Sequence, residues 1–406
     1  MADPAPLRVT MSTIAYWPSV GGSQLYVQRI AEALCARGHD VEVLTGEAPI
    51  GGPPGAPERV GPVVVRRHPV PRLLLRLQRA VRGTWMRRPT SGDPWDLPLH
   101  PLLVGPLSPG LLGAIRRAGR ERDVVVAGPA PWLTLTAPAA WRGRARVVGL
   151  PQLHVSRTEP HRVVARSLRR CDVVVTATAH EAATVRRAGA ARVETIPLGT
   201  DPGAFVDLDP STARAELGLP ERPTVGYVGR IARHKGIDTL LAAADRLWRD
   251  AEGPTVVVAG ATTGWDGLRP EVERRGTEDR LVVRTDVSDE ERALLLAACD
   301  VVVLASSDES FGIGVAEAWA ARRPVVASDI PVLRELVRDG VDGRTFPLGD
   351  AEALADVLAQ LLAAPDGTRA MGDEGRRRVD AELRWDVVVD RWVELVEGAA
   401  PGREGR

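Results

Sequence analysis

One loop in the second half of the chain brings two different cations close together. It reads Gly229-Arg230-Ile231-Ala232-Arg233-His234-Lys235-Gly236 and follows a short apolar run. Arg230 and Lys235 can lie on one side of this loop, which suits a diphosphate whose charge must be neutralised as it leaves. The loop is not a Walker loop, because that motif needs G-K-[ST] after a longer glycine-spaced run.

The composition singles out Lys235. The chain has 53 lysine and arginine residues, and Lys235 is the only lysine among them. Arginine is a planar fork and lysine a compact point charge on a flexible stem, so the two are not interchangeable where geometry is tight. We therefore interpret Lys235 as a site residue. The alternative is an ordinary surface lysine in a charged loop.

Two carboxylates follow a later apolar run. Glu309 opens the motif Glu309-Ser310-Phe311-Gly312, and Glu317 lies eight positions after Glu309. We expect a helix to begin near Gly314, which would place Glu317 in its first turn. Amide groups at a helix N-terminus favour ionised carboxylates, and these accept hydrogen bonds from hydroxyls. The pattern favours binding of a ribose and a sugar over a glycosidase acid/base pair. Glu317 alone could also be an ordinary N-terminal helix acid.

Two further candidates lie in the first half of the chain. Gly21 and Gly22 precede an expected helix over residues 23–37, where glycine lets backbone N–H groups approach a phosphate or a sugar. A turn is the alternative, and the motif is not a G-x-G-x-x-G fingerprint. His154 follows an expected strand and could bond a sugar hydroxyl, although a lone histidine is as often structural. The seven histidines show no metal-ligand spacing, so no bound metal is expected.

Short valine-rich runs recur along the whole chain, with helical stretches between them. Continuous apolar runs, unlike alternating ones, indicate strands buried on both faces of a parallel sheet. The alternation predicts two doubly wound, Rossmann-like α/β domains, in which ligands bind beyond the carboxyl ends of the strands. The expected strands cover residues 8–11, 41–45, 63–65, 124–127, 147–150, 173–177, 193–197, 225–228, 255–259, 281–283, 301–305 and 325–327.

Length and charge narrow the class of protein. A chain of 406 residues exceeds one ordinary core. We predict an N-terminal domain over 1–198, a linker over 199–222 rich in glycine and proline, a C-terminal domain over 223–383, and a final helix within 384–406 that returns to the first domain. Residues 48–62 are expected to form a mobile loop. A formal net charge of zero argues against nucleic-acid binding. The expected location is the cytoplasm.

In this order, the motifs resemble the retaining family 4 glycosyltransferases of GT-B fold, which carry an E-x7-E motif. The resemblance covers nearly the whole chain. It includes Gly21-Gly22, Arg170-Cys171-Asp172, Ile196-Pro197-Leu198-Gly199, the loop from Gly229 to Gly236, and the segment from Glu309 to Glu317. The resemblance implies two Rossmann-like domains that face a central cleft and a metal-independent transfer of sugar from a nucleotide-sugar donor. A UDP- or GDP-sugar is the expected donor, and no cofactor is expected.

The resemblance also implies roles for the candidate residues. Arg230 and Lys235 would hold the donor diphosphate and stabilise its charge as it leaves, and Glu317 would bind the nucleotide ribose. Glu309, with the amides of Ser310, Phe311 and Gly312, would hold the sugar. In the first domain, Gly21 and Gly22 would approach the donor, and His154 would lie near the reacting sugar. The chain departs from the family at Arg322, where a glycine is usual, and near Asp286, where the nucleotide base would lie.

The acceptor is not named by any motif, but one basic segment bears on it. Arg72, Arg76, Arg79 and Arg82 recur at helical spacing beside Leu73 and Leu77. Such a helix could contact an anionic membrane peripherally and bring the enzyme to a lipid-linked acceptor. A solvated helix is slightly favoured, and a small metabolite or natural product is an equally compatible acceptor.

Two alternatives to a glycosyltransferase remain open. A nucleotide-sugar epimerase of the same fold would need acid/base groups around the sugar. A catalytically inactive partner subunit would bind a sugar nucleotide without turnover.

Overall fold

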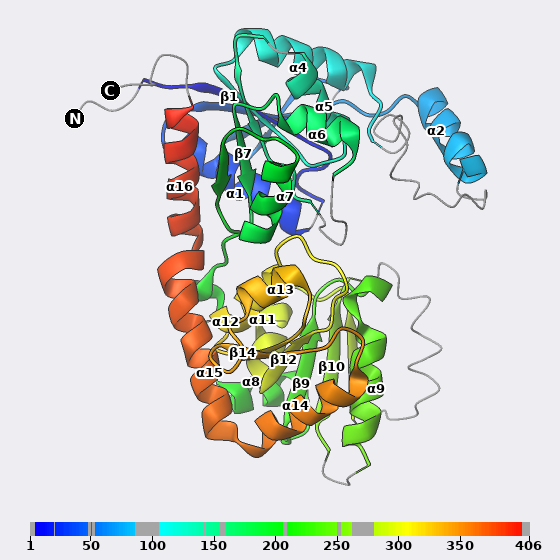
Figure 1. Cartoon of the computed structure of the whole chain (residues 1–406), viewed down its shortest axis with the longest axis vertical. Coiled ribbons are helices and arrows are strands. Elements are labelled where there is room, and N and C mark those ends of the chain that lie inside the picture. Colours follow the sequence, from blue (N-terminus) through cyan, green and yellow to red (C-terminus); the bar gives the residue numbers. More distant parts are fainter. Residues whose placement is uncertain are drawn as a thin grey trace. The chain divides into compact units, whose positions relative to one another are not determined.

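The computed structural model describes residues 5–19, 21–47, 50, 53–85, 105–141, 143–153, 160–205, 209–249, 253–261 and 280–399, with only the backbone described for 79–85. The chain divides into two compact units (Figure 1). Unit 1 comprises Met1–Pro197 and Val388–Arg406, and unit 2 comprises Leu198–Val387. Residues 199–222, which were expected to form a linker, therefore belong to unit 2, where α8 (Pro210–Leu217) packs on α11 (Asp289–Ala298).

Unit 1 contains an eight-stranded sheet in the order β3-β4-β2-β1-β5-β6-β7-β8. All neighbouring strands run parallel except β3 and β4. The strands are β1 (Arg8–Thr13), β2 (Asp40–Thr45), β3 (Pro57–Val60), β4 (Val63–Arg67), β5 (Val124–Ala127), β6 (Arg146–Gly149), β7 (Val173–Thr176) and β8 (Val193–Thr195). The central strands are valine-rich and buried, as expected for strands covered on both faces. The helices are α1 (Gly22–Ala36), α2 (Arg72–Trp85), α4 (Pro109–Glu121), α5 (Leu133–Ala140), α6 (Arg162–Leu168) and α7 (Ala179–Arg187).

Residues 48–62 were expected to form a mobile loop, but Pro57–Val60 within them form strand β3. It pairs with β4 in antiparallel register, from Pro57 opposite Arg66 to Val60 opposite Val63. Glycine and proline around it suggested a loop, but an edge strand needs only one partner and tolerates proline there.

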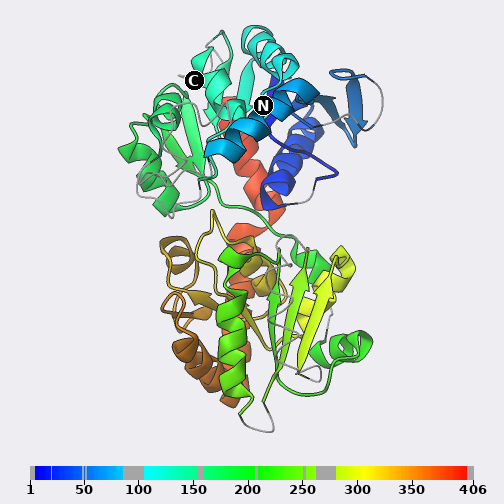
Figure 2. The same cartoon turned by 90° about the vertical axis from the view of Figure 1, so that its right-hand side faces the viewer.

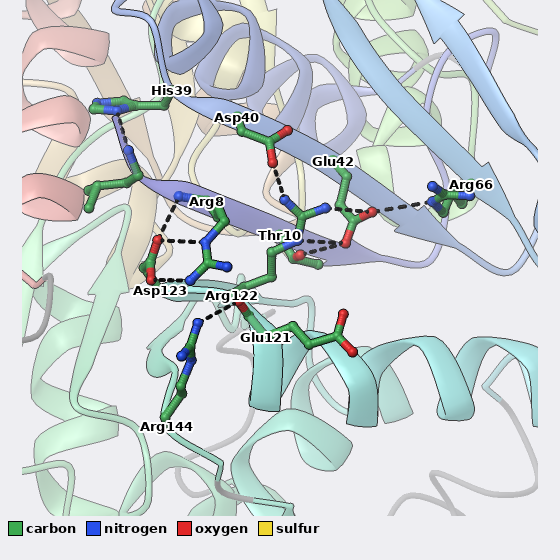
Figure 3. Close-up of polar contacts among 11 residues, drawn as sticks. Arg8, Thr10, His39, Asp40, Glu42, Arg66, Glu121, Arg122, Asp123 and Arg144 are labelled. Atoms are coloured by element: carbon green, nitrogen blue, oxygen red, sulfur yellow. Dashed lines mark hydrogen bonds and ion pairs between the residues drawn. The ribbon is translucent and has the colours of Figure 1, made fainter. Parts of the chain in front are cut away.

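A buried carboxylate ties several strands of unit 1 together at their amino ends. Glu42 on β2 is 8% exposed and accepts hydrogen bonds from Thr10 on β1 at 2.9 Å, Arg122 before β5 at 3.2 Å and Arg66 on β4 at 3.3 Å. Figure 3 shows these side chains converging on Glu42, with Arg8 and Asp123 paired beside them. Because a buried charge is costly unless it is paired, these contacts compensate the burial of Glu42.

Unit 2 contains a six-stranded parallel sheet in the order β11-β10-β9-β12-β13-β14. Helix α9 (Ile237–Leu247) packs with α14 (Ala351–Ala363) on one face, and α8 packs with α11 on the other (Figure 1 and Figure 2). The remaining helices are α12 (Ile313–Ala320), α13 (Pro331–Leu336) and α15 (Pro365–Arg378). The strands are β9 (Thr224–Val228), β10 (Thr255–Gly260), β11 (Leu281–Thr285), β12 (Val301–Leu304), β13 (Val325–Ser328) and β14 (Gly343–Phe346).

The last helix, α16 (Trp385–Gly398), begins in unit 2 and contributes its residues from Val388 onward to unit 1. Trp392 is fully buried there and donates a hydrogen bond from its indole N–H to the Tyr26 hydroxyl at 2.7 Å. Tyr26 in turn donates to the Ile196 carbonyl at 2.9 Å. The two rings meet edge to face, with centroids 5.8 Å apart. Unit 1 is thus completed by a segment distant in sequence. No helix in the described ranges is long and apolar enough to cross a bilayer.

We expect Trp392→Ala to lower the free energy of unfolding by about 3–5 kcal/mol, because it opens a large cavity and leaves the Tyr26 hydroxyl without its donor. Urea unfolding followed by circular dichroism measures the loss. Trp141→Ala is the matched control, since Trp141 is 41% exposed and should cost far less. Equal losses for the two variants would show that the packing of α16 does not hold unit 1 together.

Candidate functional site

The loop 229–236 follows β9 and is held against the ends of the two neighbouring strands. The Gly229 N–H donates to the Ala259 carbonyl on β10 at 2.8 Å, and the Ile231 N–H donates to the Ala261 carbonyl at 3.1 Å. On the other side, the Ser307 N–H beyond β12 donates to the His234 carbonyl at 2.8 Å. The loop is therefore fixed at the carboxyl edge of the unit 2 sheet, where open α/β sheets bind ligands.

Two glycines make this close packing of backbones possible. Gly236 has a φ of +66°, and a Cβ built on it would lie 2.1 Å from the Ala305 carbonyl oxygen. A Cβ on Gly260, at the end of β10, would lie 1.8 Å from the Gly229 carbonyl oxygen. Neither contact can be relieved by moving a flexible side chain, because both involve backbone atoms. The positions of these loops depend on glycine at 236 and 260.

Gly236→Ala is expected to cost several kcal/mol more than Gly218→Ala. Both glycines have nearly the same backbone conformation, with φ of +66° and +65° and ψ of 29° for each, but a Cβ on Gly218 would meet nothing within 4 Å. The control therefore carries only the left-handed cost of about 1–2 kcal/mol. Urea unfolding of both variants measures the difference. Similar stabilities would mean that the Ala305 backbone moves aside.

The structure brings Lys235 and Glu309 together at this edge. The Lys235 ammonium lies 2.7 Å from Glu309 Oε1, and each side chain is 12% exposed. The Ser306 hydroxyl donates to the same oxygen at 2.8 Å. Within the described part of the chain, no residue donates to Glu309 Oε2, so this oxygen can accept a ligand hydroxyl. The pair thus places a cation beside a carboxylate oxygen that can accept a hydrogen bond.

Arg230 is exposed at the start of the loop, and its guanidinium forms no ion pair with the residues described. Its backbone is held by strand β9, because the Tyr227 hydroxyl donates to the Arg230 carbonyl at 2.6 Å. Burial raises the pKa of Tyr227, so the phenol keeps its proton and remains a donor. Arg230 thus combines an ordered backbone with a free cationic side chain.

Glu317 is held by a residue that the sequence analysis did not identify. Arg292 on α11 lies 2.5 Å from Glu317 Oε1, and the Glu317 side chain is 10% exposed. The helix α12 begins at Ile313, one residue earlier than expected, so Glu317 lies beyond the first turn. The expectation of a first-turn acid was wrong, because Gly312 takes a φ of +92° and caps the helix. Arg292 therefore supplies the charged partner of Glu317.

Ser310, Phe311 and Gly312 lead from Glu309 into α12. Phe311 is 2% exposed, and its side chain therefore serves packing. A Cβ on Gly312 would lie 2.9 Å from Leu333 Cδ2. The first amides of α12 follow directly, and such amides can bind ligand oxygens.

His234 lies between the cations of this loop. Burial lowers the pKa of His234 below its ordinary value, and the charges of Lys235 and Arg230 lower it further. The unfolded chain therefore binds a proton at a higher pH than the folded chain does. His234 is neutral in the folded chain at pH 7, and the positive charge of the loop comes from its arginines and Lys235.

We expect acidification below about pH 6.5 to reduce stability through His234, by at most about 1.4 kcal/mol per pH unit. His234→Gln should flatten the slope of the free energy of unfolding between pH 5 and 7. Urea unfolding at each pH measures both slopes, and equal slopes for wild type and variant would contradict the assignment.

Gly21 and Gly22 lie in unit 1, where Gly21 caps α1 and Gly22 is its first residue. The segment before them is held by Arg67, which is 1% exposed and pairs with Glu47 at 2.7 Å and Glu58 at 3.0 Å. Arg67 also donates to the Trp17 carbonyl. The φ of Gly21 is 165°, so its conformation does not itself require glycine.

The remaining predicted residues are only partly described. His154 lies outside the described residues. Arg72 and Arg76 are exposed on α2, as are Leu73 at 69% and Leu77 at 53%. Arg79 and Arg82 lie in the same helix, but their side chains are not among those described. In the described ranges, no group of three or more His, Cys, Asp or Glu residues could hold a metal ion.

Three residues of the site carried no signal in the sequence. Tyr227 lies inside the buried strand β9 and Ser306 follows the buried strand β12. The sequence pattern therefore indicated only that both belong to the sheet. Arg292 is one of many arginines, on a helix expected only to cover the sheet. Their contributions depend on contacts between distant segments, which a spacing pattern does not reveal.

Two family models match the chain. One, described as Glycosyltransferase Family 4, matches residues 20–204, and the other, described as Glycosyl transferases group 1, matches residues 210–378. The chain is 30% identical over 422 residues to the D-inositol 3-phosphate glycosyltransferase of Xylanimonas cellulosilytica, covering 95% of this chain and 94% of that protein. It is 32% identical over 325 residues to the GDP-mannose-dependent alpha-(1-6)-phosphatidylinositol monomannoside mannosyltransferase of Mycobacterium tuberculosis, covering 74% and 82%.

A solved structure with a similar fold is that of Anabaena HepE in complex with UDP and glucose. The TM-score is 0.72 at 19% sequence identity, and the match covers 97% of this chain and 100% of HepE. At this identity the likeness concerns the fold.

Proposed function

This chain belongs to the family 4 glycosyltransferases and has their GT-B fold, and we propose that the residues gathered at the carboxyl edge of its unit 2 sheet bind the nucleotide-sugar donor. The observation that carries the proposal is the Lys235–Glu309 pair at 2.7 Å, next to the free cation of Arg230 and the first amides of α12. Cations, a carboxylate that accepts hydrogen bonds, and backbone amides together match the diphosphate, the sugar and the ribose of a sugar nucleotide.

The charges of Arg230 and Lys235 support binding of the diphosphate by these two residues. Arg230 has no carboxylate partner in the described ranges, and Lys235 has only Glu309. A diphosphate that gains charge as it leaves would be stabilised by both cations. Because Lys235 is also held by Glu309, its ammonium is already in place before the donor arrives. Such preorganisation lowers the cost of stabilising the transition state.

The two carboxylates would bind hydroxyls of the donor. Glu309 uses one oxygen for Lys235 and Ser306, which leaves Oε2 for a sugar hydroxyl. The amides of Ser310, Phe311 and Gly312 would serve the same sugar. Glu317, positioned by its ion pair with Arg292, would accept from the ribose.

We propose that the reaction retains the anomeric configuration and uses no side chain as a nucleophile. The bond between the anomeric carbon and the diphosphate oxygen breaks, and the acceptor oxygen bonds to the same face of that carbon. The departing phosphate takes the proton of the acceptor hydroxyl, while Arg230 and Lys235 stabilise its charge. Roles for Gly21, Gly22 and His154, and independence from a metal, stay predictions.

The names of similar proteins suggest which substrates to test. GDP-mannose appears in the name of the mycobacterial relative and UDP in the HepE complex, so UDP- and GDP-sugars are the first donors. Both relatives are named for inositol-containing acceptors, one a phosphate and one a lipid. A lipid acceptor would suit peripheral membrane contact through α2, where Arg72 and Arg76 lie beside exposed Leu73 and Leu77.

The test is a thermal-shift screen against UDP-, GDP-, ADP- and dTDP-sugars without added metal. One nucleotide class is expected to raise the unfolding midpoint of the wild type, and Lys235→Ala should weaken its binding at least tenfold. Arg233→Ala is the matched control, because Arg233 is an exposed cation in the same loop and forms no ion pair with the residues described. Equal weakening in both variants would show that only the net charge of the loop matters.

Turnover separates the transferase from its alternatives. With the identified donor, transfer to an inositol phosphate or a lipid-linked acceptor supports the proposal. Conversion of the donor to its epimer would identify an epimerase, and binding without any turnover would identify an inactive partner subunit.

A further inference from the structure

A cavity of about 300 Å³ lies at the opposite end of the unit 2 sheet. Pro223, Asp300 and Pro324 line it, and these residues directly precede β9, β12 and β13. The candidate donor site instead follows the carboxyl ends of β9 and β12. Strands of four or five residues separate the two places by roughly 13–17 Å. The cavity is therefore distinct from the donor site.

Most of the charge around this cavity is positive. Five arginines and two acids line it, which leaves three cations in excess. Apolar walls come from Pro223, Pro324, Pro365, Leu361 and Leu362. The charged residues are Arg214, Arg222, Arg322, Arg323, Arg369, Glu221 and Asp300.

Both acids of the cavity, Glu221 and Asp300, form ion pairs with Arg214. Arg214 lies 2.7 Å from Asp300 and 3.2 Å from Glu221, and it also donates to the Ala298 carbonyl at 3.0 Å. Asp300 in addition accepts from the Thr224 N–H at 2.8 Å. Arg214 is therefore a structural residue, and the two acids are committed to it.

Arg323 has no such partner. It is 9% exposed, its Nε is buried without a hydrogen bond, and it forms no ion pair in the described part of the chain. Burial lowers the pKa of Arg323, although a guanidinium still keeps its proton at neutral pH. A buried and unpaired charge is unfavourable unless something compensates it. Asp300 and Asp209 act on it only as nearby charges, and because the side chain lines the cavity, an anion bound there could pair with it directly.

Two arginines next to Arg323 also contribute to the lining of the cavity. Arg222 lines the cavity and forms no ion pair with a described residue. Arg322 has a φ of +59°, a left-handed conformation that is unfavourable for a non-glycine residue. Its guanidinium lies 2.7 Å from Asp373 at the exposed rim. The chain thus carries an arginine at a position where glycine would be less strained.

We propose that this cavity is a second anion-binding site, which takes the phosphoryl group of a small phosphorylated metabolite or free inorganic phosphate. Arg323 and Arg222 hold the phosphoryl oxygens, since guanidinium groups match phosphate geometry. The proline and leucine walls contact the organic part of an ester. A cavity of this size is at the small end of ligand pockets, which suits a ligand smaller than a sugar nucleotide.

Titration calorimetry with inorganic phosphate and with a hexose 6-phosphate tests the proposal in a chloride buffer. The Lys235→Ala variant of the whole chain is the reference, because it lacks one of the two cations proposed to bind phosphate at the donor site, which weakens phosphate binding there. We expect one saturable phosphate per chain in this variant and none in Lys235→Ala/Arg323→Met. Tighter binding of the hexose phosphate would identify an ester as the ligand, and equal binding would identify free phosphate.

Two further variants keep the result interpretable. Lys235→Ala/Arg222→Gln alters a half-buried residue, and we expect it to weaken phosphate binding at least tenfold even if the Arg323 variant does not fold. Lys235→Ala/Arg334→Gln is the matched control, because exposed Arg334 pairs with Asp329 away from the cavity. Absence of saturable binding in the reference variant overturns the proposal, as does unchanged binding in both cavity variants.

Discussion

Two close backbone contacts in unit 2 lie where loops leave the sheet. At Gly236 and Gly260, the absence of a side chain lets one loop lie against the carbonyl of another. Without that approach, the segments after β9, β10 and β12 could not exchange backbone hydrogen bonds, and Lys235 could not reach Glu309. The chemistry of the site therefore depends on a steric constraint in the backbone, and the charged side chains follow from it.

The strands of this fold could be predicted from sequence because most are buried on both faces. A continuous apolar run such as residues 124–127 then matches its strand, Val124–Ala127, residue for residue. Strand β3 could not be found this way, because its residues Pro57–Val60 are half-buried or exposed and its pairing depends on β4. Periodicity reports burial, and an edge strand with little burial leaves little signal.

The site was predictable in its residue types and less so in its geometry. Lys235 stood out by composition, and the spacing of Glu309 and Glu317 pointed to a loop that enters a helix. The partner of Glu317 could not be predicted, since Arg292 reaches it from another helix. The start of α12 depends on the left-handed conformation of Gly312, which spacing alone does not show. The same short helix leads through Ala321 to Arg322 and Arg323, so it connects the candidate donor site with the arginine-lined cavity.

The route of the chain through unit 1 has a consequence for its synthesis. Tyr26 and Ile196 are made before unit 2, and Trp392, which packs against Tyr26, is made after it. Ribosomes add about 5–20 residues per second, so the stretch Leu198–Val387 takes roughly 10–40 s to translate. Unit 2 is continuous in sequence and can fold as it emerges. During that interval, the face of α1 that α16 covers is open, so apolar surface of unit 1 stays exposed to solvent until α16 has been made.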